Sequence, residues 1–204
     1  TTGSIFMKIV QIGCNNCDDH VFDLVSKNAD SIETLIVVDP LAKCVEVAKQ
    51  KYAFLAERLI VVQCAISPTM GVAPFYCPVD DDMSVVASLS KDHIYAHHHS
   101  GFTPKGPINE TWVPCLTINS FLESFVSLQT GFHLYVDTEG HDVDILLGLD
   151  LARFRVSKIQ WESIHSDGPF KVGPKAQALL QRLHSHGYIF DLCDTMNVVA
   201  TLPE

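Results

Sequence analysis

The sequence predicts a single α/β domain in which a doubly wound, mostly parallel sheet ends in a C-terminal antiparallel hairpin. Short apolar runs alternate with segments of helical periodicity, a pattern typical of strands that helices bury on both faces. The 204 residues are enough for one domain, 1–204, and neither a repeat nor a break in composition divides them. The last two apolar runs are separated only by Asp194-Thr195-Met196, which predicts a hairpin.

Each parallel strand is expected where a short run is rich in β-branched residues, with an amphipathic helix further along the chain. The predicted parallel strands are 8–13, 34–39, 59–67, 133–137 and 158–162, and the closing hairpin strands are 188–193 and 197–202. The predicted helices are 19–27, 41–52, 120–127, 142–149 and 176–186.

The middle of the chain departs from this alternation. Residues 72–78 are expected to add an antiparallel strand, and 112–119 to form an edge strand. Segment 84–109 is rich in His, Gly, Pro and Ser, so an irregular insertion or a lid is expected there. On a helix, His93 and His97 would share one face, a spacing that metal sites use, but the surrounding glycines and prolines favour a solvated run, His97–His99, in a loop.

Composition and charge exclude some kinds of partner. The formal net charge of −10 would repel a phosphate backbone, so a nucleic acid partner is not expected. No apolar run approaches the length of a membrane span. The seven cysteines are an odd number, and several lie in apolar runs, as Cys64 does. We therefore expect reduced, buried thiols in a cytoplasmic protein rather than a disulfide framework.

The turn after the first predicted strand has features of a cofactor site. It begins Gly13-Cys14-Asn15, and in doubly wound folds ligands bind at the carboxyl ends of the strands. A glycine there lets the backbone approach a ligand, and the N-terminus of the following helix offers N–H groups to an anion. Asp39 ends the second strand, 22 residues after Cys17, close to the spacing of an acid that binds ribose hydroxyls. The turn carries only one glycine of the usual set, so it is a weak signal without Asp39.

Other candidate residues follow the remaining strands. Cys64 and Ala65 end the third strand, where backbone groups can contact an adenine edge. Asp137 and Glu162 end two neighbouring parallel strands and are expected on the same rim. Three side chains in the adjoining turns can reach that rim: Glu139, His141 and His165. For the two histidines, an ordinary role as polar loop residues is an equal alternative.

Several segments match one known family. They are VQIGCNNCDD (10–19), LIVVDPLAKCVEVAKQKY (35–52), CAIS (64–67), VPCLTINSFLE (113–123), YVDTEGHDVDILLGLD (135–150), KIQWESIH (158–165), HGYIFDL (186–192) and MNVVA (196–200). Their order and their Asp-x-Glu-Gly-x-Asp motif resemble the FkbM-type methyltransferase family, and the likeness covers nearly the whole chain. The stretch 135–150 is its most specific part.

The resemblance implies a Rossmann-like class I methyltransferase fold of seven strands, the last antiparallel, and transfer of methyl from S-adenosylmethionine to a hydroxyl of a sugar, glycan or natural product. It places Gly13, Asn15 and Asp39 against the cofactor, with Cys64 and Ala65 beside the adenine, and we add Cys14 of the same turn as a candidate. The chain departs from the family at Cys17, where a glycine is usual, and this departure puts the path of the turn in question.

Methyl transfer to a hydroxyl needs positioning and a group that removes the proton. We expect Asp137 near the methyl donor and either Glu162 or His165 as general base, with Glu139 and His141 as further candidates. A divalent metal on Asp137, Glu162 and His165 is a minority hypothesis, because their spacing is not diagnostic. No metal ligand is therefore assigned.

Two alternatives stay open. A non-catalytic binding module that keeps the fold is suggested by Cys17, and a small NAD-dependent oxidoreductase is disfavoured by the single-glycine turn and the closing hairpin. The chain begins almost at its first strand. We therefore expect an open acceptor site, suited to a glycan or another large substrate or completed by a second subunit of a homo-oligomer.

Overall fold

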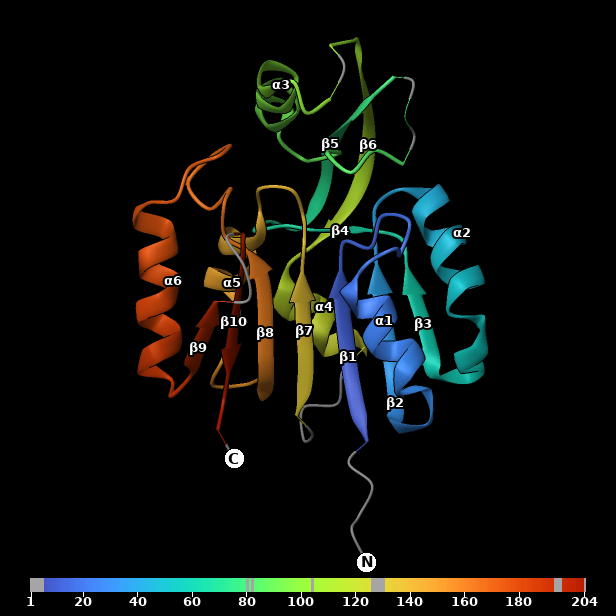
Figure 1. Cartoon of the computed structure of the whole chain (residues 1–204), viewed down its shortest axis with the longest axis vertical. Coiled ribbons are helices and arrows are strands. Elements are labelled where there is room, and N and C mark those ends of the chain that lie inside the picture. Colours follow the sequence, from blue (N-terminus) through green and yellow to red (C-terminus); the bar gives the residue numbers. More distant parts are fainter. Residues whose placement is uncertain are drawn as a thin grey trace, which may run out of the picture.

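A seven-stranded sheet forms the centre of the molecule (Figure 1). The structure is a computed structural model and describes residues 6–79, 81, 83–103, 105–125, 131–192 and 196–203. The strand order is β3-β2-β1-β7-β8-β10-β9. The strands are β1 (Met7–Ile12), β2 (Ile32–Val38), β3 (Leu59–Val62), β7 (Phe132–Val136), β8 (Val156–Glu162), β9 (Ile189–Leu192) and β10 (Asn197–Thr201).

The direction of the strands matches the expected topology. Neighbours from β3 to β8 are parallel, whereas β10 is antiparallel to both β8 and β9. The chain runs outward from β1 to β3 and then returns to β7 on the other side of β1. The strand order therefore reverses between β1 and β7, and at such a point a doubly wound sheet opens a crevice for a ligand.

Helices cover both faces of this sheet. One face carries α1 (His20–Lys27) and α2 (Ala42–Lys51), with the short 3-10 helices η1 (Ala29–Ser31) and η2 (Ala53–Arg58) at their C-terminal ends. The other face carries α4 (Ile118–Phe125), α5 (Asp142–Gly148) and α6 (Pro174–Ser185). Successive residues of each strand point to opposite faces. Leu35 and Val37 of β2 accordingly pack on the first layer, and Ile36 and Val38 on the second.

A second, three-stranded sheet lies beyond the carboxyl ends of the parallel strands (Figure 1). It contains β4 (Ala65–Ile66), β6 (Ile108–Leu116) and β5 (Gly71–Pro78) in that order, with β5 and β6 antiparallel. The helix α3 (Lys91–Ser100) lies between β5 and β6 in sequence and beside their sheet in Figure 1.

The structure corrects three expectations about the middle of the chain. The predicted strand 59–67 is split between the two sheets, with β3 in one and β4 in the other. The first part of the predicted edge strand 112–119 is the end of β6, which belongs to the small sheet, and its last two residues begin α4. Segment 84–109 is not wholly irregular, because it contains α3. Burial of His93, Ile94, His97 and His98 orders this helix, although its sequence lacks an ordinary apolar stripe.

The remaining predicted elements are found with small shifts at their ends. Parts of three predictions lie outside the described residues: the strand end at Cys193, the hairpin turn at Asp194 and Thr195, and the helix end at 126–127. The six described cysteines are buried and no disulfide joins them. No helix in the described part of the chain combines the length and the apolar character that crossing a membrane requires.

Candidate functional site

A cavity of about 230 Å³ opens at the carboxyl ends of β1, β2 and β7. It lies at the point where the strand order reverses. All of the residues predicted to bind the cofactor line it: Gly13, Cys14, Asn15, Asp39, Cys64, Ala65 and Asp137. Glu139 also lines it, whereas His141, Glu162 and His165 do not contribute to its wall. The structure therefore brings together residues from four separate strand ends.

The turn after β1 has an unusual backbone. Gly13, Asn15 and Cys17 all have left-handed φ angles, of 80°, 44° and 55°. The N–H of Gly13 donates to the carbonyl of Val38 at 2.8 Å, which continues the β1–β2 pairing into the turn. The family resemblance leads us to expect a glycine at Cys17, and the left-handed φ of this residue is a conformation that glycine adopts most easily. The cysteine adopts this conformation with its side chain buried.

Asp39 holds this turn in place. Its Oδ2 accepts hydrogen bonds from the backbone N–H groups of Cys14 (3.1 Å) and Asn15 (3.2 Å), and its Oδ1 accepts one from Leu41 (2.9 Å). Burial raises the pKa of this carboxyl, and the three hydrogen bonds oppose that rise. The Cys14 thiol donates a fourth, weaker hydrogen bond to Oδ2 at 3.7 Å, so the roughly four acceptor positions of the ionised carboxylate are occupied, and a ligand hydroxyl would replace the thiol. Asp39 thus connects the cavity wall with the turn above it.

The N-terminus of α1 is capped by a side chain of the protein, whereas the sequence led us to expect N–H groups free to bind an anion. Asp19 caps the helix, because its Oδ1 accepts from the N–H of Phe22 at 2.8 Å. One N–H group of the helix N-terminus that was expected to face an anion, that of Phe22, is therefore already bonded, and those of Cys14 and Asn15 in the preceding turn donate to Asp39. The same region instead adds the carboxylates of Asp18 and Asp19 to the cavity wall. These acids favour a ligand that carries positive charge at this end.

One wall of the cavity was not predicted. It comes from β5 and the segment between β5 and α3, and its members are Phe75, Ser84, Val85, Ala87 and Leu89. Phe75 and Ala65 belong to a small hydrophobic cluster with Val113 and Cys115. These residues lie in the small sheet or next to it, and their sequence pattern does not reveal that this sheet folds over the strand ends.

Three carboxylates converge where β7 and β8 end. Asp137, Glu139 and Glu162 each place one oxygen within 4.8 Å of the others. The Asp137 side chain is open to the cavity, yet its depth in the molecule raises its pKa by desolvation, and the charge of Asp19 raises it further. Desolvation, and then the charge of Asp137, raises the pKa of Glu139 well above its usual range. Glu139 also has a left-handed φ of 54°, and such strain clusters at functional sites.

Asp142 fixes the relative position of these strand ends. One carboxylate oxygen accepts from the N–H of Thr138 at 2.7 Å, and the other accepts from the N–H of Glu162 at 3.0 Å. The carboxylate is buried, and desolvation raises its pKa. Asp142, the last residue of the Asp-x-Glu-Gly-x-Asp motif, is therefore a structural link between the end of β7 and the end of β8, a role that its sequence pattern did not indicate.

The histidine-rich segment is not a solvated loop, which corrects the preferred interpretation of the sequence. His93 and His97 lie on one face of α3, and their buried rings meet that of His165. Burial lowers the pKa of each of these three imidazoles to about 4, and the neighbouring rings lower those of His97 and His165 further. Of the predicted run, only His99 is exposed.

The two candidate histidines after the strand ends are both enclosed. His165 is buried in this cluster, and its Nδ1 accepts from the N–H of Phe170 at 2.9 Å. His141 immediately precedes α5, and burial lowers its pKa. Neither is an ordinary exposed loop residue.

The sheet order, the antiparallel β10 and the cavity at the strand reversal define a class I methyltransferase domain. The chain belongs to the FkbM methyltransferase family, because the family model "Methyltransferase FkbM domain" matches residues 10–190. A search of curated proteins finds no match.

Solved structures show the same fold at low sequence identity. The methyltransferase FkbM from Methylobacillus flagellatus KT is 12% identical with a TM-score of 0.55, over 98% of this chain and 44% of that one. The METTL16 methyltransferase domain is 10% identical with a TM-score of 0.51, over 100% of this chain and 62% of that one. The chain thus spans less than two thirds of the length of either structure.

Proposed function

We propose that the chain binds S-adenosylmethionine in the cavity and methylates a hydroxyl group of a sugar, glycan or natural product. The observation that carries the proposal is the convergence of all seven predicted cofactor residues on one cavity at the strand reversal. Membership of the FkbM family supports the reaction class. The hydroxyl acceptor comes from the family resemblance and is the finer part of the proposal.

The residues that line the cavity fit this cofactor chemically. On Asp39, a ribose hydroxyl can replace the weak hydrogen bond that the Cys14 thiol donates to Oδ2. Cys64 and Ala65 present backbone beside apolar Phe75, which suits an adenine ring. The carboxylates of Asp18, Asp19 and Asp137 suit the positive charges of a sulfonium and an amino group. Both the apolar and the positively charged parts of the cofactor therefore have a matching wall.

The chemistry that S-adenosylmethionine supplies when bound is an electrophilic methyl group on a positively charged sulfur. The chain must then hold an acceptor hydroxyl in line with that group and remove its proton. We assign Asp137 to the donor end of the cavity and Glu162 to proton removal, because the two carboxylates meet beside it. His165 Nε2 lies 3.8 Å from Glu162 Oε2, which suits a role in orienting that carboxylate.

Glu162→Gln tests the assignment of the base. The substitution keeps the size of the side chain and leaves the backbone N–H that donates to Asp142. With radiolabelled methyl donor and a panel of sugars and phenols, we expect kcat to fall by about 10²- to 10⁴-fold while donor affinity is unchanged. Unchanged kcat in this variant would exclude Glu162 as base.

One observation favours a second candidate, the non-catalytic binding module. Cys17 holds a left-handed φ in a position suited to glycine, so the turn carries a conformational cost. Methyl transfer to any hydroxyl acceptor would exclude this candidate. The family match argues against the nicotinamide oxidoreductase. A homo-oligomer that completes an open acceptor site stays a prediction, and the mass of the protein in solution tests it.

A further inference from the structure

Two histidines of α3 point to the same place. His93 and His97 are four residues apart, so they lie on one face of the helix. Their ring centroids are 4.5 Å apart. Gly140 allows this approach, since a β-carbon at its position would lie 3.2 Å from His93 Nδ1, and its φ of 102° suits only glycine. The helix is thereby held close to the loop that follows β7.

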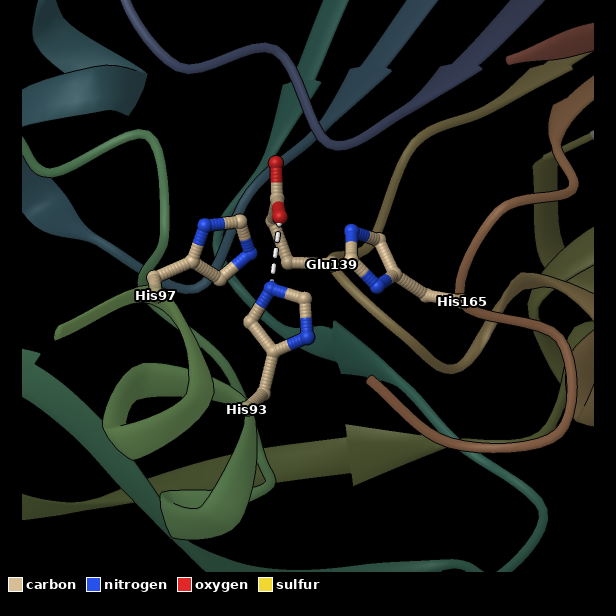
Figure 2. Close-up of side chains that lie close together, drawn as sticks. All are labelled: His93, His97, Glu139 and His165. Atoms are coloured by element: carbon tan, nitrogen blue, oxygen red, sulfur yellow. Dashed lines mark hydrogen bonds and ion pairs between the residues drawn. The ribbon is translucent and has the colours of Figure 1, made fainter. Parts of the chain in front are cut away.

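The loops after β7 and β8 bring two further residues to these histidines, one carboxylate and a third imidazole. Glu139 Oε2 lies 2.7 Å from His93 Nε2. The ring centroid of His165 lies 4.5 Å from that of His93 and 5.3 Å from that of His97. Figure 2 shows the three imidazole rings arranged around the Glu139 carboxylate. One ligand atom from each of the four residues lies within 4.8 Å of all the others.

The three histidines of this cluster are buried, but the ring nitrogens of one of them have no hydrogen-bond partner among the described residues. His93, His97 and His165 are only 1%, 6% and 3% exposed. Neither ring nitrogen of His97 has a hydrogen-bond partner among the described residues. A buried polar group left without a partner costs about 1–3 kcal/mol. Phe170 packs on the rings of both His97 and His165 and helps to enclose the cluster. An ion at the centre would give His97 a partner.

We propose that His93, His97, Glu139 and His165 bind one transition-metal ion of the zinc class. Three imidazoles and one carboxylate are a donor set for zinc or a similar ion, whereas magnesium and calcium prefer oxygen ligands. A tetrahedral ion with bonds of about 2.0–2.1 Å holds its ligands about 3.4 Å apart, which lies between the 2.7 Å that separates His93 Nε2 from Glu139 Oε2 and the 4.8 Å limit for the whole group. Four protein ligands in an enclosed site are typical of a structural metal rather than a catalytic one.

The ion would join three segments that are distant in sequence. It would tie α3 to the loops after β7 and β8, and Glu139 lines the cofactor cavity. Metal binding would therefore fix one wall of that cavity and hold the helix near it. The site does not include the seven cofactor residues, so its test needs no methyl donor and its outcome is independent of the proposed reaction.

The test uses untagged, full-length protein that has been stripped with chelator and then titrated with Co²⁺. Tetrahedral Co²⁺ has intense visible absorption, and displacement by Zn²⁺ reports the affinity for zinc. His97→Ala removes one ligand, and His99→Ala is the matched control because His99 is an exposed histidine of the same helix. Loss of a group that only hydrogen-bonds to a metal ligand weakens metal binding by about 10- to 100-fold. Loss of a direct ligand should therefore weaken it by at least about 100-fold.

We expect one equivalent of Co²⁺ with a tetrahedral spectrum in the wild type and in His99→Ala, and no such spectrum in His97→Ala. A wild type that binds no stoichiometric Co²⁺ or Zn²⁺ would overturn the proposal, and so would an unchanged spectrum in His97→Ala. If that variant does not fold, thermal unfolding of the stripped wild type decides instead. Zn²⁺ should raise its melting temperature and Mg²⁺ should not. A melting temperature that rises with Mg²⁺ alone, or that neither ion raises, would overturn the proposal.

Discussion

Gly13 packs directly against the backbone carbonyl of Asp137, so that a β-carbon on Gly13 would lie 1.7 Å from that oxygen. The N–H of Asp137 also donates to the carbonyl of Ile12 at 2.9 Å. These contacts place the turn after β1 and the acidic end of β7 on the same cavity. The single glycine of the turn is therefore required by the approach of another strand, as well as by its φ of 80°.

Gly13→Ala is expected to destabilise the protein and to abolish cofactor binding. The left-handed φ costs about 1–2 kcal/mol for a residue with a β-carbon, and forcing extra volume into a packed site costs about 1–3 kcal/mol. Denaturant unfolding should show a loss of about 2–5 kcal/mol. Gly148→Ala in α5 is the control, because no atom lies within 4 Å of its β-carbon position. Equal stability of the two variants would contradict this account of Gly13.

Asp39→Asn should loosen the turn that carries Cys14 and Asn15. The amide has one acceptor oxygen in place of two, so at least one of three charge-assisted hydrogen bonds is lost, each worth about 1.5–3 kcal/mol. We expect a Kd for S-adenosylmethionine at least about tenfold higher, measured by calorimetry. Asp23→Asn removes an exposed charge of α1 and serves as control. Similar affinities in the two variants would show that Asp39 has no role in binding.

Asp142→Ala should separate the ends of β7 and β8. It leaves the backbone N–H groups of Thr138 and Glu162 without their acceptor, at about 1–3 kcal/mol each. The free energy of unfolding should therefore fall by about 2–6 kcal/mol. Asp144→Ala, two residues along α5, breaks only a partly exposed ion pair with Lys175 and should cost at most about 1 kcal/mol. Equal unfolding free energies of the two variants would contradict the role of Asp142 as a link between the ends of β7 and β8.

His133 predicts a dependence of stability on pH. Desolvation, and then the charge of Lys158, lowers its pKa in the folded protein, so the unfolded chain binds the proton first as the pH falls below about 6.5. Its contribution to stability is therefore full above about pH 6.5 and decreases as the pH falls toward the lower pKa of the folded state.

His133→Gln removes this proton linkage and leaves the other histidines in place. Between pH 6.5 and 5, its unfolding free energy should fall less steeply than that of the wild type, by at most about 1.4 kcal/mol per pH unit. Identical slopes of unfolding free energy against pH in the variant and the wild type would mean that His133 has the same pKa in the folded and the unfolded protein.

Much of the fold was predictable because it depends on local patterns. The parallel strands are continuous apolar runs, and the closing hairpin follows from two such runs joined by three residues. The wall of the cavity was predictable for the same reason, since the carboxyl ends of parallel strands meet on one edge. Gly13, Asp39 and Asp137 were found in this way.

The rest depends on tertiary packing that no local pattern encodes. The helix α3 buries His93, Ile94, His97 and His98, and three imidazoles do not form a recognisable apolar stripe. The small sheet divides a run that reads as one strand, and its position over the cavity is set by pairing of β5 with β6. The metal hypothesis on Asp137, Glu162 and His165 included one of the four clustered ligands, because the helix that supplies two others was interpreted as a loop.

The central claim is that this domain binds S-adenosylmethionine in the cavity beside Gly13 and Asp39. Calorimetric titration of the folded protein with S-adenosylmethionine and S-adenosylhomocysteine, with Asp39→Ala as control, tests it most directly. The account predicts one site of micromolar Kd, about −8 kcal/mol, that is lost in the variant. Absence of binding by the folded wild type, or equal binding by Asp39→Ala, would contradict it.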